Sequence, residues 1–538
     1  MKRLIGTFFV LFYVWCGFTG RALAQPAEAA PPQPAGAPAP QPAGAPAPQP
    51  AGAAAPQPAK PAAHKFFEPK EGKGVTFYTL PGGEITFYGN LDVSFDVTTK
   101  GISDLKDSNG NVPVGHVGWM PAIGTNLSYI GARGFQKLGD PLSFVYQLET
   151  QLDIAASSGL SESNSNKSDV VKGGLTSRNS FIGFSTPWGS LKVGKTDAPY
   201  KLATTRMNPF SGMIGDYSVV MGNTGGDNRV EFGTRLDHSI WYESPKIFGF
   251  NFAVLFSPGQ NRAVASDNLP SGGADCAGGN IPGSGGTGAP GGAPISCNDG
   301  AFGHVLSGSL TYEYGPSSGW DFYVATAYER HYKVNRNSDI YGIYGYPLPA
   351  AVSNYAAHDV ADEDAFKIGA QVVLPTHTTV GGFFEDFHRY VPDYLQFQNE
   401  RQRLGFWLTV SQQLTSADSL HVGWAHAYKT PGDPGQHNTA INDVGNGGMA
   451  GGLDADNSAN MYAAAIKHSF GHGVLVYLAW AYTVNAQFAH YDLGAGGRSL
   501  TTDCHDANLP ASGDVNANPH CWAGGNLMGF SLGMKAVF

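Results

Sequence analysis

The sequence predicts an all-β protein: a sixteen-stranded antiparallel transmembrane β-barrel, preceded by a disordered Pro/Ala-rich segment. Three observations lead to this prediction. From about residue 84 to the end, apolar residues alternate with small or polar ones in segments of 8 to 14 residues. Short turns and long polar loops follow these segments in alternation. The last segment ends at Phe538, with Phe530, Leu532, Met534 and Ala536 on one face and small or polar residues on the other. Such strands suit a barrel with lipid outside and water inside.

The amino terminus is predicted to be a secretory signal peptide, residues 1–24. Lys2 and Arg3 begin it, an apolar stretch follows at 4–18, and Ala22-Leu23-Ala24 supplies small residues for cleavage. No later segment offers the roughly 20 uninterrupted apolar residues of a spanning helix. A membrane location would therefore depend on strands, and the remaining alternative is a soluble secreted protein.

Residues 25–72 are predicted to be a Pro/Ala-rich periplasmic linker, which leaves 73–538 for the barrel. The unit QPAGAPAP occurs at 33–40 and again at 41–48. Proline at this density removes backbone donors and fixes φ, so the segment is expected to be extended and disordered. At about 3.1 Å per residue it is long enough to reach peptidoglycan from the barrel. A passive spacer and a peptidoglycan contact both fit this segment.

Charge and cysteine content restrict the partners. The formal charge of −10 disfavours nucleic acid and favours cations near the surface. Cys16 lies in the signal peptide, and the other four cysteines form two sequence-local pairs in Gly-rich loops. We predict disulfides Cys276–Cys297 and Cys504–Cys521 in two external loops. A metal site lacks the expected close spacing, so we expect no metal and no cofactor.

The strands are predicted in order along the chain. Several alternate clearly, and a soluble sandwich would instead carry charged residues along its exposed face. The asymmetry between short turns and loops of 20 to 40 residues favours a barrel inserted from one side. The predicted strands lie near 84–97, 125–137, 142–154, 178–186, 189–196, 235–244, 249–257, 304–315, 320–331, 364–374, 378–388, 401–414, 418–428, 460–470, 474–485 and 527–538.

Several of these segments resemble one known family. ITFYGNLDVSFDV, YIGARGFQKLG, LSFVYQLET, RNSFIGFSTPWGSLKVGKT and IWYESPKIFGFNFAVLFSP follow one another in the order of the Gram-negative general porins, and the terminal Phe matches as well. The resemblance covers nearly all of 75–538. It implies a homotrimer in the outer membrane, in contact with lipid and lipopolysaccharide.

The resemblance also implies a constriction inside the barrel. The loop at about 197–234 would fold inward, and its stretch MNPFSGMIGD is similar to the family's loop tip, with Asn208, Pro209, Phe210 and Gly212 as matching residues. The family's glutamate beside the proline is missing, which leaves Asp216, Asp227 and Glu231 as acidic candidates. A basic wall would stand opposite, with Tyr129 at one position where the family has arginine. The candidates on this wall are Arg133, Arg178, Lys192, Lys195 and Arg235, beside the inward-facing Gln147 and Glu149.

The expected activity is passive diffusion of small hydrophilic solutes and ions through a water-filled channel. A substrate-selective channel and a structural barrel that anchors the envelope through its linker remain open. An enzyme is not expected, because no Ser/His/Asp arrangement is found. Arg401, Arg403 and Lys467 are interpreted as charges that solvate a wide lumen.

Overall fold

The computed structural model describes the strands of the barrel part of the chain together with some of their connections. The predicted signal peptide, nearly all of the linker, the four loop cysteines, Asp227, Glu231 and Arg401 lie outside the described residues. The described residues are 67, 72–79, 81–99, 119–155, 176–222, 232–258, 302–316, 318–335, 360–390, 402–431, 456–486, 489, 491–494 and 526–538.

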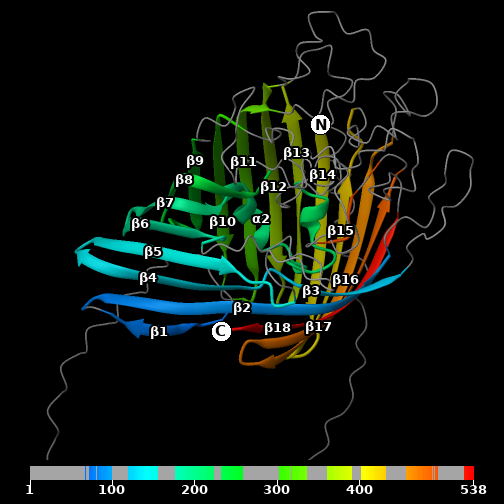
Figure 1. Cartoon of the computed structure of the whole chain (residues 1–538), viewed down its shortest axis with the longest axis horizontal. Helices are drawn as coiled ribbons and strands as arrows, with labels where there is room; N and C mark the ends of the chain where they lie inside the picture. The colour runs from blue at the N-terminus through cyan, green and yellow to red at the C-terminus, as the bar shows by residue number, and fades with distance from the viewer. Residues whose placement is uncertain are drawn as a thin grey trace, which may run out of the picture. The chain divides into compact units, whose positions relative to one another are not determined.

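The described chain is almost entirely antiparallel sheet (Figure 1). Two short helical segments, α2 (Pro199–Thr205) and η1 (Tyr217–Val219), interrupt it. The strands are β1 (Val75–Tyr78), β2 (Gly83–Thr98), β3 (Met120–Thr125), β4 (Tyr129–Gly139), β5 (Leu142–Gln151), β6 (Ser180–Thr186), β7 (Gly189–Asp197), β8 (Arg235–Glu243), β9 (Phe250–Ser257), β10 (His304–Tyr314), β11 (Asp321–Asn335), β12 (Val360–Val373), β13 (Thr378–Arg389), β14 (Arg403–Gln413), β15 (Asp418–Ala427), β16 (Ala459–Gly471), β17 (Val474–Asn485) and β18 (Leu527–Val537).

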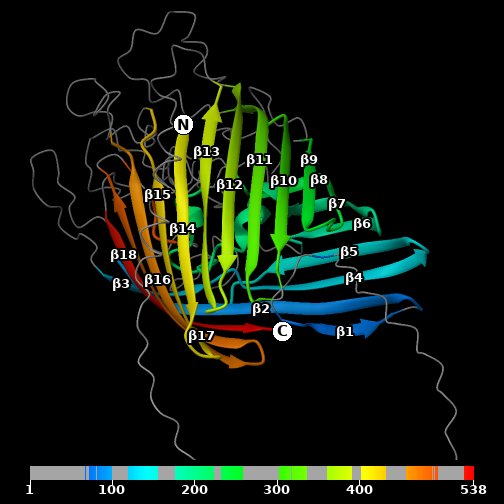
Figure 2. The ribbon, with the colours of Figure 1, turned by 180° about the vertical axis from the view of Figure 1, so that it is seen from behind.

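Neighbouring strands pair in sequence order, and β18 pairs with β2 to close the ring (Figure 2). The first half of β2 pairs with β4 and its second half with β3. β3 and β4 therefore share one position in the barrel, that of the strand predicted at 125–137, although β3 overlaps the predicted range only at Thr125; β1 is a short addition. The sixteen-stranded closed barrel is confirmed, with each predicted strand in its place.

The break between β3 and β4 has a local cause. Leu127 adopts a positive φ of 55°, which an extended strand does not allow. The flanking side chains replace the lost ladder: the Ser128 hydroxyl accepts from the Asp92 N–H at 2.9 Å, and Asn126 donates to the Asp92 carboxylate at 2.9 Å. The sequence alternation alone did not predict this break.

The barrel closes where the chain ends. Phe538 and Gly89 exchange two backbone hydrogen bonds, at 3.0 and 3.1 Å. A Cβ atom on Gly89 would lie 2.4 Å from the Phe538 ring, so the aromatic side chain occupies the space that glycine leaves. β1 then pairs with residues 84–87 of β2, beyond the end of β18. β1 was not predicted from the sequence, because four residues are too few to establish a period.

The outward face is apolar, as predicted. In β18, Phe530, Leu532 and Met534 are 47%, 60% and 61% exposed, whereas Ser531 between them is buried. The same parity in β14 exposes Leu404 and buries Arg403. A band of exposed apolar side chains around a closed sheet fits contact with hydrocarbon.

No helix among the described residues has the length and apolar character that crossing a membrane requires.

Candidate functional site

A loop inside the barrel is the centre of the candidate site. We call its described part, residues 198–222 and 232–234, the inward loop. It begins with α2, which lies against β10 and β11 within the ring of strands (Figure 1). The Tyr200 N–H donates to the Ser307 hydroxyl at 3.1 Å, and the Tyr323 hydroxyl donates to the Ala203 carbonyl at 2.8 Å. Proline at the first turn fits a helix that starts without a side-chain cap.

A buried ion pair holds the middle of the inward loop. Arg403 lies 2.8 Å from Glu385, and their side chains are 0% and 1% exposed. Arg403 also donates to the Val220 carbonyl at 2.6 Å, while Glu385 accepts from the Gly222 N–H at 2.8 Å and from the Tyr200 hydroxyl at 3.1 Å. Burial, and then the Glu385 charge, raise the pKa of Tyr200 well above its usual value, so its hydroxyl stays a donor.

This finding corrects the interpretation of Arg403 and Lys467 as residues that merely solvate the lumen. Lys467 donates to the Pro209 carbonyl at 2.6 Å. Both cations bind backbone carbonyls of the inward loop. The alternation of β14 and β16 predicts that they face inward, but the residue each one meets depends on the path of a distant loop.

The loop tip packs on β14, β16 and β17. The Trp407 indole donates to the Met207 carbonyl at 2.8 Å and meets Phe210 edge-on, with ring centroids 6.0 Å apart. A Cβ atom on Gly215 would lie 2.6 Å from the Cβ of Ala463. Small inward residues on these strands therefore let the tip approach the wall closely.

Asp216 organises the tip from within. One carboxylate oxygen accepts from the Asn208 side chain at 2.9 Å and from the Ser218 N–H at 3.0 Å, and the other accepts from the Gly212 N–H at 2.8 Å. The residue is only 4% exposed. Asp216 was a candidate for the acidic half of the constriction, but its carboxylate binds groups of the inward loop.

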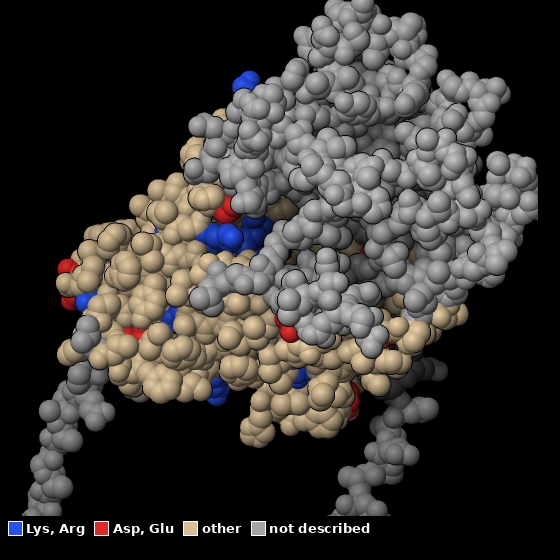
Figure 3. Space-filling view, in the orientation of Figure 1, with Lys and Arg blue, Asp and Glu red and all other residues tan. Residues whose placement is uncertain are grey.

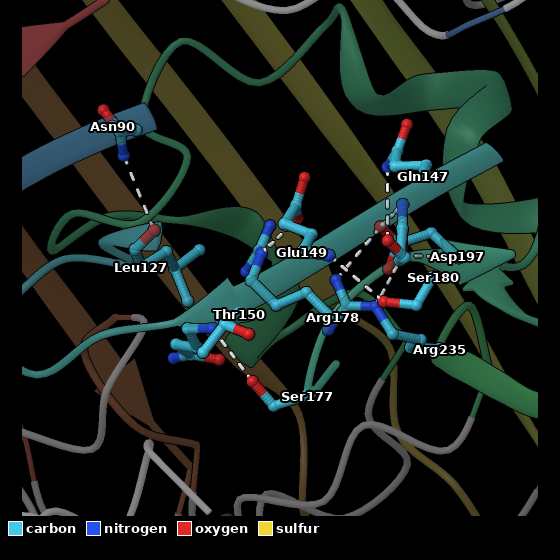
Figure 4. A network of polar contacts seen from close by, with 12 residues as sticks. Asn90, Leu127, Gln147, Glu149, Thr150, Ser177, Arg178, Ser180, Asp197 and Arg235 are labelled. Carbon is cyan, nitrogen blue, oxygen red and sulfur yellow. Dashed lines mark hydrogen bonds and ion pairs between the residues drawn. The ribbon is translucent and has the colours of Figure 1, made fainter. Parts of the chain in front are cut away.

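The residues of the predicted basic wall belong to the part of the chain from β4 to β8, away from the strands that contact the loop tip. Several of their charges are paired with carboxylates (Figure 4). Glu149 is 2.5 Å from Arg178 and accepts from the Tyr88 hydroxyl at 3.0 Å. Arg235 lies 3.1 Å from Asp197, which also pairs with Lys201 at 2.9 Å. Each of these two carboxylates thus balances at least one cation of the wall.

The remaining wall candidates have different surroundings. Lys192 is buried, 2.7 Å from Glu243, and lies over the Phe181 ring. Arg133 pairs in register with Gln147 and stacks over the Tyr88 ring. Gln147 donates to the Asn179 carbonyl at 3.3 Å. Lys195 pairs with Ser180 of β6 and lies beside a break in the register of β7 and β8. This pairing places Lys195 on the same face of β7 as Val193, which is exposed.

The charged side chains that the described inward loop exposes are basic. Lys201 is 43% exposed and Arg206 is 31% exposed. Arg206 pairs with Glu313 at 2.8 Å and stacks over Tyr323. Figure 3 shows a group of Lys and Arg atoms in a hollow of this face, near the position of α2 and β10 in Figure 1. The described residues contain no cluster of His, Cys, Asp or Glu that could hold a metal ion.

Most of the residues that fix the loop were not predicted from the sequence. Tyr200, Arg206, Glu385 and Trp407 were not among the candidates. A pattern that could have found two of them is the presence of large or charged side chains at inward positions of β13 and β14, where a wide lumen needs only small polar residues.

Comparison with known proteins agrees with the barrel. A family model described as Gram-negative porin matches residues 50–487. An outer membrane porin protein of Bordetella pertussis is 28% identical over 179 residues, which cover 32% of this chain and 42% of that protein. Major outer membrane protein P.IA of Neisseria meningitidis serogroup C is 27% identical over 143 residues, covering 26% and 30%. The chain thus spans less than half the length of these curated relatives.

Among solved structures, an anion-selective porin from Comamonas acidovorans has a TM-score of 0.51 at 15% identity, over 85% of this chain and 100% of that one. This likeness shows the fold alone. The family model, by contrast, matches more than half of the sequence, including the described strands β1 to β17. The chain therefore belongs to the Gram-negative porin family, whose matched relatives are outer-membrane proteins.

Proposed function

We propose that the barrel is a water-filled outer-membrane channel through which small hydrophilic solutes and ions diffuse passively. The observation that carries this proposal is the inward loop, held across the inner face by Arg403, Trp407 and Lys467. A ring of sixteen strands encloses more space than its own side chains fill. A loop fixed inside that space narrows it without closing it, and limits the size of the solutes that pass.

The constriction lies, in this proposal, between the inward loop and the basic wall of Arg133, Arg178, Lys192 and Arg235. On the loop side a solute meets Lys201 and Arg206, which stay partly exposed although Lys201 pairs with Asp197 and Arg206 with Glu313. Asp216 does not contact the solute, since its buried carboxylate accepts three hydrogen bonds from the loop itself. Gln147 and Glu149 shape the wall rather than contact the solute.

This arrangement favours anions over cations, although the formal charge of the chain is −10, because Arg178, Lys201 and Arg235 are each more exposed than the carboxylate with which they pair. Local charges at a narrow, poorly screened passage influence permeation more than charges distributed over a whole surface. The related fold from Comamonas acidovorans is named as anion-selective. A channel selective for one anionic solute is the second candidate, and the exposed Lys201 and Arg206 are the residues that support it.

The rest of the chain has proposed roles that follow from its sequence and family. Residues 1–24 direct export, and 25–72 form a periplasmic tether that contacts peptidoglycan. Cys276–Cys297 and Cys504–Cys521 brace external loops. The barrel assembles as a homotrimer surrounded by lipid and lipopolysaccharide, and its chemistry is transport without catalysis.

Swelling of proteoliposomes tests the proposed function. Vesicles that contain the refolded protein are placed in isotonic solutions of neutral sugars of increasing size, then in salts of small organic anions. We expect swelling that is fast for small sugars, slows smoothly with size, and shows no saturation. Vesicles that swell only with one solute, at a rate that saturates, would instead support the selective channel.

A further inference from the structure

A second segment enters the barrel beside the inward loop. It comes from the connection after β17, and its described part is Ala489 with Tyr491–Gly494, which we call the return segment. Ala489, Tyr491 and Leu493 are at most 1% exposed, although they belong to a connection between two strands. Connections normally run over the surface, so complete burial needs a specific set of contacts.

The wall of the barrel holds the return segment through its backbone. Asn485 donates to the Tyr491 carbonyl at 2.9 Å and accepts from the Tyr491 N–H at 2.9 Å. The Thr483 hydroxyl donates to the Asp492 carbonyl at 2.8 Å. Because the order of the contacts reverses that of β17, the segment runs back along the inner face of this strand.

Packing where β18 pairs with β2 supports the same course of the return segment. A Cβ atom on Gly529 of β18 would lie 2.7 Å from the Leu493 side chain and 2.8 Å from that of Thr98. Leu493 thus fills the space above a glycine at the β18–β2 contact. The return segment therefore covers the inner wall near the end of β17 and the beginning of β18.

The return segment also pairs with the tip of the inward loop. Ile214 and Gly494 form an antiparallel bridge, and the Gly215 N–H donates to the Leu493 carbonyl at 2.9 Å. The pairing is close: a Cβ atom on Gly494 would lie 2.4 Å from the Ile214 Cα. The tip is therefore held by Lys467 at Pro209 and by the return segment at Ile214 and Gly215.

We propose that the return segment is a second constriction element, which clamps the tip of the inward loop and sets the solute size limit together with it. The clamp adds backbone contacts at Ile214 and Gly215, where the tip also packs on Ala463 of β16. This inference rests on the proposed function for its effect on solutes, whereas the clamp itself is independent of transport.

The test removes the contacts on the wall and leaves the inward loop unchanged. Thr483→Val and Asn485→Ala delete the hydrogen bonds to the return segment, singly and together. Thr409→Val is the matched control, because Thr409 is also a buried threonine whose hydroxyl donates to a strand carbonyl, that of Val422, at 3.0 Å. Gly494→Val is a second disruption, acting by steric clash. Heat-modifiable gel mobility verifies that each barrel is folded.

Three quantities are measured on each folded variant: single-channel conductance, the largest sugar that swells proteoliposomes, and hydrogen exchange of peptides within 207–222. We expect higher conductance, passage of larger sugars and faster exchange for the Thr483, Asn485 and Gly494 variants, with wild-type values for Thr409→Val. Exchange and conductance equal to the control in all three would overturn the proposal.

A folded wild-type protein without conductance or swelling would reject the proposed channel function and, with it, the size-limiting role of the segment. Hydrogen exchange still decides the clamp in that case. Faster exchange of 207–222 in the variants retains it, and unchanged exchange rejects it.

Discussion

Arg403 on β14 and Glu385 on β13 form an ion pair at 2.8 Å behind the inward loop, and each also binds the loop backbone, at Val220 and Gly222. Two charges removed from water stabilise a structure only when their geometry and remaining hydrogen bonds compensate the lost hydration. Here the loop supplies part of that compensation. The position of the loop and the burial of the pair therefore depend on each other.

Removing one member of this pair is expected to release the loop. Arg403→Ala leaves Glu385 buried without its counter-ion, a change that costs about 3–5 kcal/mol in comparable sites. We expect a noisier channel current and a lower temperature of barrel unfolding. Arg330→Ala is the control, since its pair with Asp362 at 2.8 Å is partly exposed and worth about 0–1 kcal/mol. Equal effects of the two substitutions would contradict the anchoring role.

Two glycines of the loop tip separate backbone strain from close packing. Gly215 and Gly212 have φ of 82° and 78°, so an alanine costs about 1–2 kcal/mol at either position. Only Gly215→Ala adds a clash, 2.6 Å from Ala463, whereas the nearest atom to a Cβ on Gly212 is 3.4 Å away. We expect Gly215→Ala to change the conductance more. Ala463→Gly should restore it in the double variant, and a failure of this rescue would argue against tip packing.

Asp216 is predicted to act on loop structure more than on ion selectivity. Asp216→Asn replaces one acceptor oxygen by a donor, so at least one N–H of the tip loses its partner at a cost of about 1–3 kcal/mol. We expect faster hydrogen exchange at 207–222 and a nearly unchanged reversal potential in a KCl gradient. Glu243→Gln is the comparison: its carboxylate is 33% exposed and faces Lys192, so its loss should increase anion preference. A larger shift for Asp216→Asn would assign Asp216 to the pore lining.

The contact of Gly89 with Phe538 is predicted to stabilise the closed ring. Gly89→Ala places a Cβ atom 2.4 Å from the Phe538 ring, which must then leave its position beside the last backbone pair. Gly308→Ala is the matched strand glycine, with its nearest neighbour at 3.7 Å. We expect a lower unfolding temperature for Gly89→Ala, read by heat-modifiable mobility, and no loss for Gly308→Ala. Equal temperatures would show that the terminal contact is dispensable.

The strands could be predicted from the sequence because side chains on a sheet alternate with a period of two, and lipid makes one face apolar. This signal is local, so it located β14 and β17 within one or two residues. It could not reveal β1, whose position depends on the unpaired edge of β2 beyond Phe538. Nor could it reveal the break at Leu127, which depends on side chains that bind Asp92 across the sheet.

The candidate site could be predicted only in part, for a similar reason. Alternation places Arg403 and Lys467 on the inner face but does not show that a loop more than 180 residues earlier lies against them. The family resemblance directed attention to the loop tip, where Pro209 and Phe210 contact Lys467 and Trp407 of the wall. It could not show that Asp216 turns inward to the loop, because that depends on the fold of the tip itself.

Single-channel recording of the refolded protein in a planar bilayer tests the central claim, a water-filled channel narrowed by a fixed loop. The measurement is the current step as a function of KCl concentration on both sides, followed by the reversal potential in a gradient. For a passive channel we expect large ohmic current steps that grow in proportion to the KCl concentration. We also expect a reversal potential whose sign shows that chloride permeates more readily than potassium. A folded barrel that gives no steps, or steps that saturate at low salt, would contradict the account.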